Sequence, residues 1–237
     1  MIKTVLFDKD GTLFDFRATW GGWAASFLLE LSSDDQAKAA QMAESVGFDL
    51  RDRSFEEDSV LIGGTPGDIV RQLLPYVPGV SAAGLVSRMN MMAASAPQCE
   101  AAPLLPLLAG LRDRGLSLGV ITNDARAPAM AHLRAAGIAG LFDGVIGSDC
   151  GFGQKPGPGQ ILAYLEKTGA DPSETVMVGD APHDMMAARA AGCHRVGVLT
   201  GPSTRQQLAP LASAVLPDIS ALPGWLDRME DARHNAA

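Results

Sequence analysis

Cysteine and histidine are scarce in this chain, whose 237 residues include 3 cysteines and 4 histidines. Cys99, Cys150 and Cys193 lie far apart, form no CxxC pair and have no histidine at metal-ligand spacing. An odd number of widely separated cysteines excludes a disulfide framework, and the missing partners exclude a zinc site built on thiolates. We therefore interpret all three as buried thiols in a reducing compartment, and we expect a cytoplasmic protein.

Long apolar runs are also missing. The longest leucine-rich stretch, around Leu104 to Leu111, is short and contains Pro106, whereas a membrane-spanning helix needs roughly 20 apolar residues. The apolar segment that follows Lys3 is too brief for a signal peptide. The sequence therefore predicts a soluble protein that is not exported and has no membrane partner.

Positive charge is in deficit, because 19 lysines and arginines stand against 27 acidic residues and give a net charge of -8 at pH 7. The average field of such a chain repels nucleic acid and anionic membranes. A small phosphorylated metabolite remains compatible with this charge where local donors and a cation reverse the potential. We expect such a partner, no nucleic acid, and a chain that acts as a monomer or a homodimer.

Apolar residues make up 47% of the chain, which is enough for one large domain or for a core with a smaller companion. Short apolar segments alternate with helical patterns, as in a parallel sheet wound with helices. The predicted strands are 2–7, 116–122, 144–147, 175–179 and 195–199. The predicted helices between them are 104–114, 127–136, 159–168 and 184–191, each followed by a helix-ending glycine. The fold class is therefore α/β, with a doubly wound, Rossmann-like parallel sheet.

The first two predicted strands are separated by roughly 100 residues, far more than a normal strand-to-helix connection. Helices are predicted there at 18–31, 34–46, 67–76 and 82–94. We expect residues 15–99 to form an inserted helical cap, and residues 1–14 and 100–237 to form the α/β core. Trp20 and Trp23 fall on one side of the first cap helix and are interpreted as packing, with a substrate-facing tryptophan as the alternative.

Polar residues follow the predicted strands, and open parallel sheets place their ligand sites at these strand ends. The residues concerned are Asp8, Lys9, Asp10, Thr122, Asn123, Asp124, Asp180 and Asp184, with Lys155 in a turn at the same rim. Asp8 and Asp10 are two residues apart, so an extended chain points both the same way, and their repulsion requires a cation. Carboxylate oxygens favour Mg²⁺ over Zn²⁺.

Lys155 and the hydroxyl of Thr122 add donors that suit the charge on a transferring phosphoryl group. Each of these residues taken alone is more often a turn, a cap or a solvated side chain. Their combination at neighbouring strand ends predicts phosphoryl transfer.

Four segments, DKDGTLFD, VITND, QKPGPG and VGDAPHDMMAARAAG, resemble the ordered motifs of the haloacid dehalogenase superfamily. The resemblance is strongest to its phosphoglycolate phosphatase-like branch, in which a helical cap follows the first motif. It covers the whole core and, more loosely, the position and helical character of the cap. Four motifs in the right order are far more specific than any one of them.

The resemblance implies that Asp8 attacks phosphorus and forms an aspartyl-phosphate, while Asp10 protonates the leaving alcohol and later activates water. It implies that Mg²⁺ is held by Asp8, Asp180 and the backbone carbonyl of Asp10, with Asp184 either a ligand or a support. Thr122, Lys155 and backbone amides near Asp10 and Asn123 would bind the phosphoryl oxygens. The implied activity is Mg²⁺-dependent hydrolysis of a small phosphate monoester, with phosphoglycolate as one candidate substrate.

Three other functions are weighed against this one. A dehalogenase is disfavoured because its pattern lacks the acid at position 10. A phosphomutase of the β-phosphoglucomutase kind and a non-catalytic phosphate-binding or sensing protein remain as alternatives.

Several other charged residues have weaker assignments. Lys9 is expected to face away from Asp8 and Asp10, and His183 is expected at the surface or behind the site. The cap arginines are candidates for a second charged group on the substrate or for solvated surface: Arg17, Arg51, Arg53 and Arg88.

Overall fold

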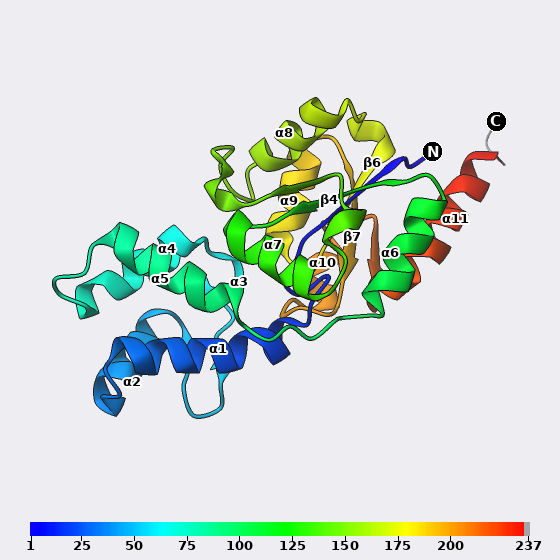
Figure 1. Cartoon of the computed structure of the whole chain (residues 1–237). Coiled ribbons are helices and arrows are strands. Elements are labelled where there is room, and N and C mark those ends of the chain that lie inside the picture. Colours follow the sequence, from blue (N-terminus) through cyan, green and yellow to red (C-terminus); the bar gives the residue numbers. More distant parts are fainter. Residues whose placement is uncertain (235–237) are drawn as a thin grey trace.

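The computed structural model describes residues 1–234 of the chain (Figure 1). Its centre is a six-stranded sheet with the order β5-β4-β1-β6-β7-β8, in which all pairings are parallel. The strands are β1 (Thr4–Phe7), β4 (Ser117–Ile121), β5 (Gly144–Ile146), β6 (Thr175–Gly179), β7 (His194–Val198) and β8 (Ala214–Leu216). The predicted α/β fold class with a parallel sheet is confirmed.

Helices cover both faces of this sheet. They are α6 (Leu104–Asp113), α7 (Arg126–Ala135), α8 (Gly159–Thr168), α9 (Pro182–Ala190), α10 (Arg205–Leu208) and α11 (Leu222–His234). Val5 and Phe7 of β1 pack in one apolar cluster with α6, α7 and α11, whereas Leu6 packs in another with α8 and α9. Neighbouring residues of a strand point to opposite faces, so β1 is buried on both sides.

A mainly helical insert lies between β1 and α6, to the left of the sheet in Figure 1. Its elements are α1 (Phe16–Leu31), α2 (Gln36–Ser45), β2 (Phe48–Asp49), β3 (Ser54–Phe55), α3 (Val60–Gly63), α4 (Pro66–Leu73) and α5 (Ala82–Ala94). Its buried side chains form an apolar cluster of their own, centred on residues such as Phe27, Met42 and Leu85. The exact domain boundaries at 14/15 and 99/100 stay a prediction.

Several boundaries differ from the predicted ones for local reasons. Helix α1 begins at Phe16 because the side chain of Asp15 caps it by accepting a hydrogen bond from Ala18 N at 2.8 Å. Short 3₁₀ turns, which the sequence did not predict, occur at Leu74–Tyr76, Ala139–Leu141, Ser148–Cys150, Pro172–Glu174 and Ile219–Ala221. The prediction of three buried cysteines is confirmed only for Cys193. Cys99 is exposed in the segment that returns from the insert to the sheet, and Cys150 is half-buried.

None of the helices in residues 1–234 is long and apolar enough to cross a membrane. The carboxyl ends of the central strands β4, β1 and β6 all lie at the edge of the sheet that faces the insert.

Candidate active site

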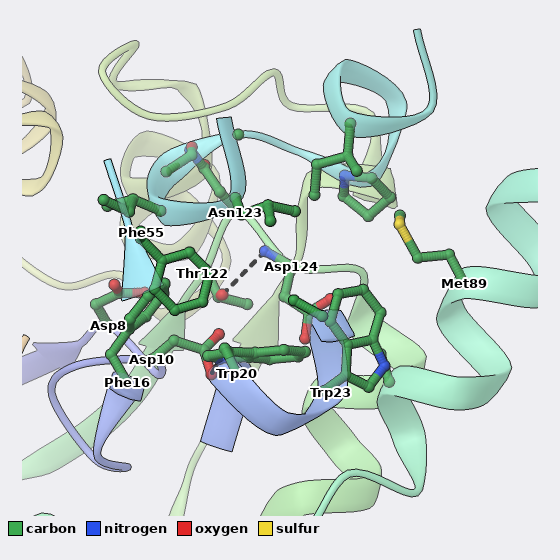
Figure 2. A pocket seen from close by; sticks show the side chains of 18 of the residues that line it. Asp8, Asp10, Phe16, Trp20, Trp23, Phe55, Met89, Thr122, Asn123 and Asp124 are labelled. Atoms are coloured by element: carbon green, nitrogen blue, oxygen red, sulfur yellow. Dashed lines mark hydrogen bonds between the residues drawn. The ribbon is translucent and has the colours of Figure 1, made fainter. Parts of the chain in front are cut away.

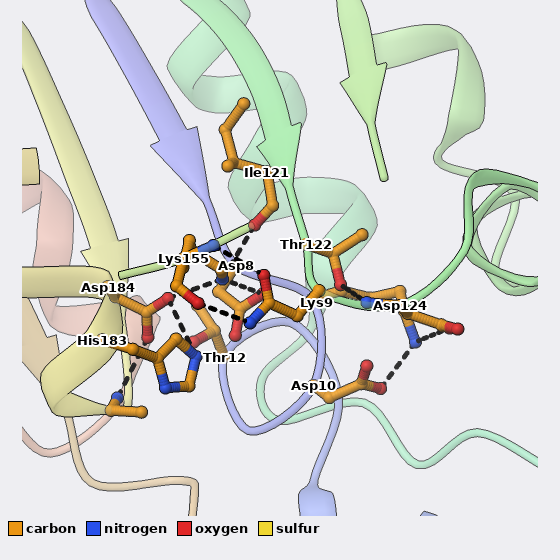
Figure 3. Close-up of polar contacts among 12 residues, drawn as sticks. Asp8, Lys9, Asp10, Thr12, Ile121, Thr122, Asp124, Lys155, His183 and Asp184 are labelled. Carbon is orange, nitrogen blue, oxygen red and sulfur yellow. Dashed lines mark hydrogen bonds and ion pairs between the residues drawn. The ribbon is translucent and has the colours of Figure 1, made fainter. Parts of the chain in front are cut away.

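The carboxylate of Asp8 lies at the end of β1, between the strands that lead to Thr122 and Asp180. Strand β1 pairs in parallel with β4 on one side and β6 on the other, which brings the three strand ends together. All three side chains are buried. The expectation that distant segments meet at this edge of the sheet is confirmed (Figure 3).

Lys155 inserts its ammonium group between Asp8 and Asp184. Its Nζ lies 2.8 Å from Asp8 Oδ1 and 2.6 Å from Asp184 Oδ1, and it donates a 3.1 Å hydrogen bond to Ile121 O. Burial lowers the pKa of Lys155, but the carboxylates of Asp184 and Asp8 outweigh burial, and the pKa lies above its ordinary value. Lys155 is therefore a permanently charged donor facing Asp8.

Asn123 holds the backbone of Lys155 in place. Its Oδ1 accepts from Lys155 N at 2.9 Å, and its Nδ2 donates to Lys155 O at 3.0 Å and to Gly63 O at 2.9 Å. Both N–H groups of the amide are therefore used inside the protein. The last bond reaches the insert, so Asn123 also joins the insert to the core.

The acids around Lys155 carry more negative charge than one ammonium group balances. Burial raises the pKa of Asp8 to about 7 against the opposing effect of Lys155. The pKa of Asp180 is raised well above its usual value, first by burial and then by the carboxylates of Asp184 and Asp8. Burial also acts on Asp184, but Lys155 and His183 outweigh it, so the pKa of Asp184 is lowered.

A bound cation fits this charge imbalance, and oxygen donors suit Mg²⁺. Ligand atoms of Asp8, Asp184 and His183 lie within 4.8 Å of one another. Both oxygens of Asp184 already accept hydrogen bonds, Oδ1 from Lys155 Nζ and Oδ2 from Ala181 N at 3.0 Å. His183 is partly buried, lines the pocket, and has its Nε2 3.6 Å from Asp184 Oδ1, so the expectation that it lies at the surface or behind the site is wrong.

Two glycines allow the main chain to pass close to Asp180. A Cβ atom at Gly11 or at Gly201 would overlap the Asp180 carboxylate, and Gly11 also has a positive φ of 79°. Thr12 Oγ1 donates to Asp180 Oδ1 at 3.3 Å, and Thr200 Oγ1 donates to Gly11 O at 2.6 Å. Thr200 and Gly201 were not predicted from the sequence, although they follow β7 much as Asp8 follows β1.

The expectation that Lys9 faces away from Asp10 is wrong. Lys9 Nζ is fully buried and lies 2.6 Å from Asp10 Oδ1, 3.3 Å from Asp124 Oδ2 and 3.1 Å from His132 Nδ1. The strand ends at Phe7, and the chain turns at once, so strand alternation does not apply to these positions. Lys9 therefore braces Asp10 from the core side.

Trp20 contacts Asp10 from the insert side. Its Nε1 donates to Asp10 Oδ1 at 2.9 Å, and Lys9 Nζ lies 5.2 Å from the centre of its ring. His132 connects Lys9 to the insert a second time. Its Nδ1 contacts Lys9, and its Nε2 lies 2.7 Å from Ala93 O at the end of α5. The interpretation of Trp20 as simple packing is therefore wrong, since it touches an acid of the site.

Removing the charge of Lys9 should destabilise the fold. In Lys9→Met, Asp10 and Asp124 lose their buried cation, and we expect a loss of about 3–5 kcal/mol in unfolding free energy at pH 7. Burial raises the folded pKa of Asp124 to about 6 although Lys9 lowers it, so this pKa should rise further without Lys9 and the ionised carboxyl at pH 7 should destabilise the variant more than wild type. At pH 5 Asp124 is mostly protonated in both proteins. The loss should therefore be smaller at pH 5 than at pH 7.

Urea unfolding of both proteins at the two pH values measures this difference. Lys167→Met is the matched control, because Lys167 is exposed on α8, and it should shift the midpoint very little. Equal midpoints for Lys9→Met and wild type at pH 7 would contradict the bracing role.

A pocket opens between this site and the insert (Figure 2). Its core side is formed by Asp8, Asp10, Thr122, Asn123, Asp124, Asp180 and His183. Its insert side includes Phe16, Trp20, Trp23, Phe55 and Met89. The four cap arginines do not line it, and Arg88 instead forms an ion pair with Glu30 at 2.6 Å.

The chain resembles known proteins over nearly its whole length. The family model for haloacid dehalogenase-like hydrolases matches residues 2–192. The protein named "Probable phosphatase IndB" of Dickeya dadantii is 32% identical over 231 residues, covering 92% of this chain and 90% of that protein. A phosphoglycolate phosphatase of Rhodospirillum rubrum is 32% identical over 239 residues, covering 95% of this chain and 91% of the relative.

Solved structures show the same architecture. The crystal structure of a predicted phosphoglycolate phosphatase from Haemophilus somnus superposes with a TM-score of 0.73 at 19% identity, covering 95% of this chain and 98% of that one. At this identity the likeness concerns the fold.

Proposed function

Because the chain belongs to the haloacid dehalogenase-like hydrolases, we propose that it is a phosphatase that hydrolyses a small phosphate monoester with Asp8 as nucleophile. One observation carries this proposal: the carboxylate of Asp8, which lines the pocket, lies 2.8 Å from the buried ammonium group of Lys155. A nucleophile and a fixed cation side by side are what a phosphoryl group needs for capture and transfer.

The proposed reaction has two steps. A carboxylate oxygen of Asp8 attacks phosphorus, the bond from phosphorus to the ester oxygen breaks, and Asp10 donates its proton to the departing alcohol. Asp10 then takes a proton from a water molecule that attacks the aspartyl-phosphate, which releases inorganic phosphate and restores Asp8. Lys9 and Trp20 support this role of Asp10, because both bind its Oδ1.

Lys155 and the hydroxyl of Thr122 are proposed to bind the phosphoryl oxygens. Thr122 lines the pocket, and its Oγ1 accepts from Asp124 N at 3.1 Å, which leaves the hydroxyl proton free for another acceptor. Asn123 is proposed to act on the substrate through its backbone amide, since its side chain already holds Lys155. Asp184 is proposed to fix the ammonium group of Lys155.

Mg²⁺ is the proposed cofactor, held by Asp8, Asp180 and the backbone carbonyl of Asp10, with Asp184 as a ligand or a support. When bound, such an ion supplies positive charge that offsets the charge on the phosphoryl oxygens and lowers the pKa of nearby carboxyls. The raised pKa values of Asp8 and Asp180 support a cation at this place. A cytoplasmic location and a monomeric or homodimeric state stay predictions.

The activity and its metal dependence are tested together. Protein treated with EDTA should release no inorganic phosphate from p-nitrophenyl phosphate, and added Mg²⁺ should restore release. A phosphomutase of the β-phosphoglucomutase kind should release little phosphate even with Mg²⁺. Full activity in EDTA would contradict the proposed cofactor, and no release under any condition would contradict the proposed phosphatase.

Phosphoglycolate is one candidate for the substrate. It is supported by the name of the Rhodospirillum rubrum relative. It carries a carboxylate besides its phosphate, so a site built for it needs a second cationic partner.

A further inference from the structure

The insert side of the pocket is apolar and aromatic. Phe16 and Phe55 meet edge to face at 5.0 Å, and Trp20 and Trp23 do so at 5.1 Å. Met89 lies at the far side of the pocket from Asp8 and Asp10 (Figure 2). A phosphate at Asp8 would therefore direct the rest of the ester toward aromatic walls, which favour flat, apolar groups.

Charge of either sign is missing from that wall. Among the described residues, those of the insert that line the pocket include no lysine, arginine, aspartate or glutamate. A carboxylate on the substrate would meet no cation on this wall and would lie close to the acids of the core. A substrate ammonium group would likewise lack an anionic partner on the insert. Burying an unpaired charge is strongly unfavourable, so the wall selects an uncharged group.

On the insert side of the pocket, two lining residues each carry a buried polar atom without a hydrogen-bond partner. Trp23 Nε1, a donor, and Asn90 Oδ1, an acceptor, are both buried and make no hydrogen bond within the described structure. Buried polar atoms in native proteins are nearly always paired. A ligand with a hydroxyl group offers both a donor and an acceptor and so complements either atom.

The size of the cavity limits the part of the ester that lies beyond the phosphate. The cavity volume of about 70 Å³ corresponds to roughly five to seven water molecules. This space suits a phosphate with one ring better than a nucleotide.

We propose that the substrate is a phosphate monoester of an uncharged, single-ring alcohol that carries a hydrogen-bonding substituent. This inference rests on the proposed phosphatase function and specifies the substrate class for the same site. It departs from phosphoglycolate, because the wall supplies the apolar contact but not the cation which that substrate needs.

A panel of three esters tests the charge selection: benzyl phosphate, phosphoglycolate and phosphoethanolamine. All three release primary alcohols, so their leaving groups are comparable. We expect kcat/KM for benzyl phosphate to exceed the other two by about tenfold or more, since even one methylene in an apolar pocket gives about tenfold discrimination. A value for either charged ester that equals or exceeds the benzyl value would overturn the inference. Failure to hydrolyse any of them or p-nitrophenyl phosphate would instead overturn the phosphatase function beneath it.

A gained charge provides a second test. Leu61 lines the pocket and is half-buried, so Leu61→Arg should supply the missing cation. We expect the ratio of kcat/KM for phosphoglycolate over benzyl phosphate to rise at least about tenfold. Leu162→Arg, at an exposed leucine on α8, is the matched control and should keep the wild-type ratio. An unchanged ratio in a folded Leu61→Arg protein, as judged by thermal melting, would overturn the inference.

The polar substituent is tested with 3-hydroxybenzyl and 4-hydroxybenzyl phosphate. Wild type should favour one of them over benzyl phosphate severalfold, and Trp23→Phe, which keeps a ring but removes the donor, should reduce that preference. Asn90→Leu removes the acceptor and is the companion variant. Equal turnover of all three esters by wild type would overturn this part of the inference.

Discussion

Asp8→Asn should abolish turnover of phosphate monoesters, with kcat falling by roughly 10⁵–10⁶, the scale on which removal of a covalent nucleophile acts. An amide oxygen in place of the carboxylate is a far weaker nucleophile and forms no aspartyl-phosphate. The fold should persist, because Asn has the same shape and the surrounding strands are held by their own packing. Phosphate release from p-nitrophenyl phosphate with Mg²⁺ measures the effect.

Asp113→Asn is the matched control for this variant. Asp113 is exposed at the end of α6, so the same chemical change there should leave both turnover and melting temperature close to wild type. If Asp8→Asn retained turnover within about tenfold of wild type, another residue would be the nucleophile. Phosphorylated protein trapped from wild type by acid quench, and absent from Asp8→Asn, would identify the intermediate directly.

Lys155→Met should lose both activity and stability. The methionine fills a similar space but leaves Asp8 and Asp184 buried without their ammonium partner. Loss of one partner from a buried ion pair costs about 3–5 kcal/mol. Turnover should fall by about 10²–10³, as when one fixed donor to a developing charge is removed.

The stability loss in Lys155→Met should depend on pH in a defined direction. The folded pKa of Asp184 is lowered by Lys155, so this pair stabilises the fold above the free carboxyl pKa of about 3.9 and loses that contribution as pH falls through the lowered value. The raised pKa of Lys155 keeps its charge throughout the neutral range. The midpoints in urea of wild type and variant should therefore differ most near pH 7 and converge in acid.

Lys167→Met again serves as the control, since it removes an ammonium group that is exposed. A midpoint for Lys155→Met equal to that of this control at pH 7 would contradict the proposed ion pair. Unchanged turnover in a folded Lys155→Met protein would exclude a role in phosphoryl binding.

The sequence was sufficient to locate the sheet and the candidate site residues, because local sequence patterns mark both the strands and the polar residues that follow them. Apolar runs that end in Asp8, Thr122 and Asp180 mark buried strands, and parallel strands bring their carboxyl ends to one edge. Strand β8, from Ala214 to Leu216, was missed because it is short and half-buried at the edge of the sheet. The β2–β3 hairpin was missed for the same reason, with two residues in each strand.

The surroundings of Asp10 were not predictable from the sequence. Lys9 reaches Asp10 because the chain turns directly after β1, and the tight approach of Gly11 to Asp180 is visible only in three dimensions. Trp20 reaches the same oxygen from another part of the fold, through a contact that no local pattern encodes. Local periodicity predicts which face of an element is buried, but not which polar atom a long side chain finds.

The hydrogen bond from Trp20 to Asp10 links the insert mechanically to the proposed acid of the site. The indole belongs to helix α1, whereas the carboxyl group belongs to the turn after β1. A tilt of α1 that widened the pocket opening would also break the hydrogen bond from Trp20 to Asp10. The hydrogen bond from Trp20 therefore couples the position of α1 to the orientation of the carboxyl group that we propose as the proton donor.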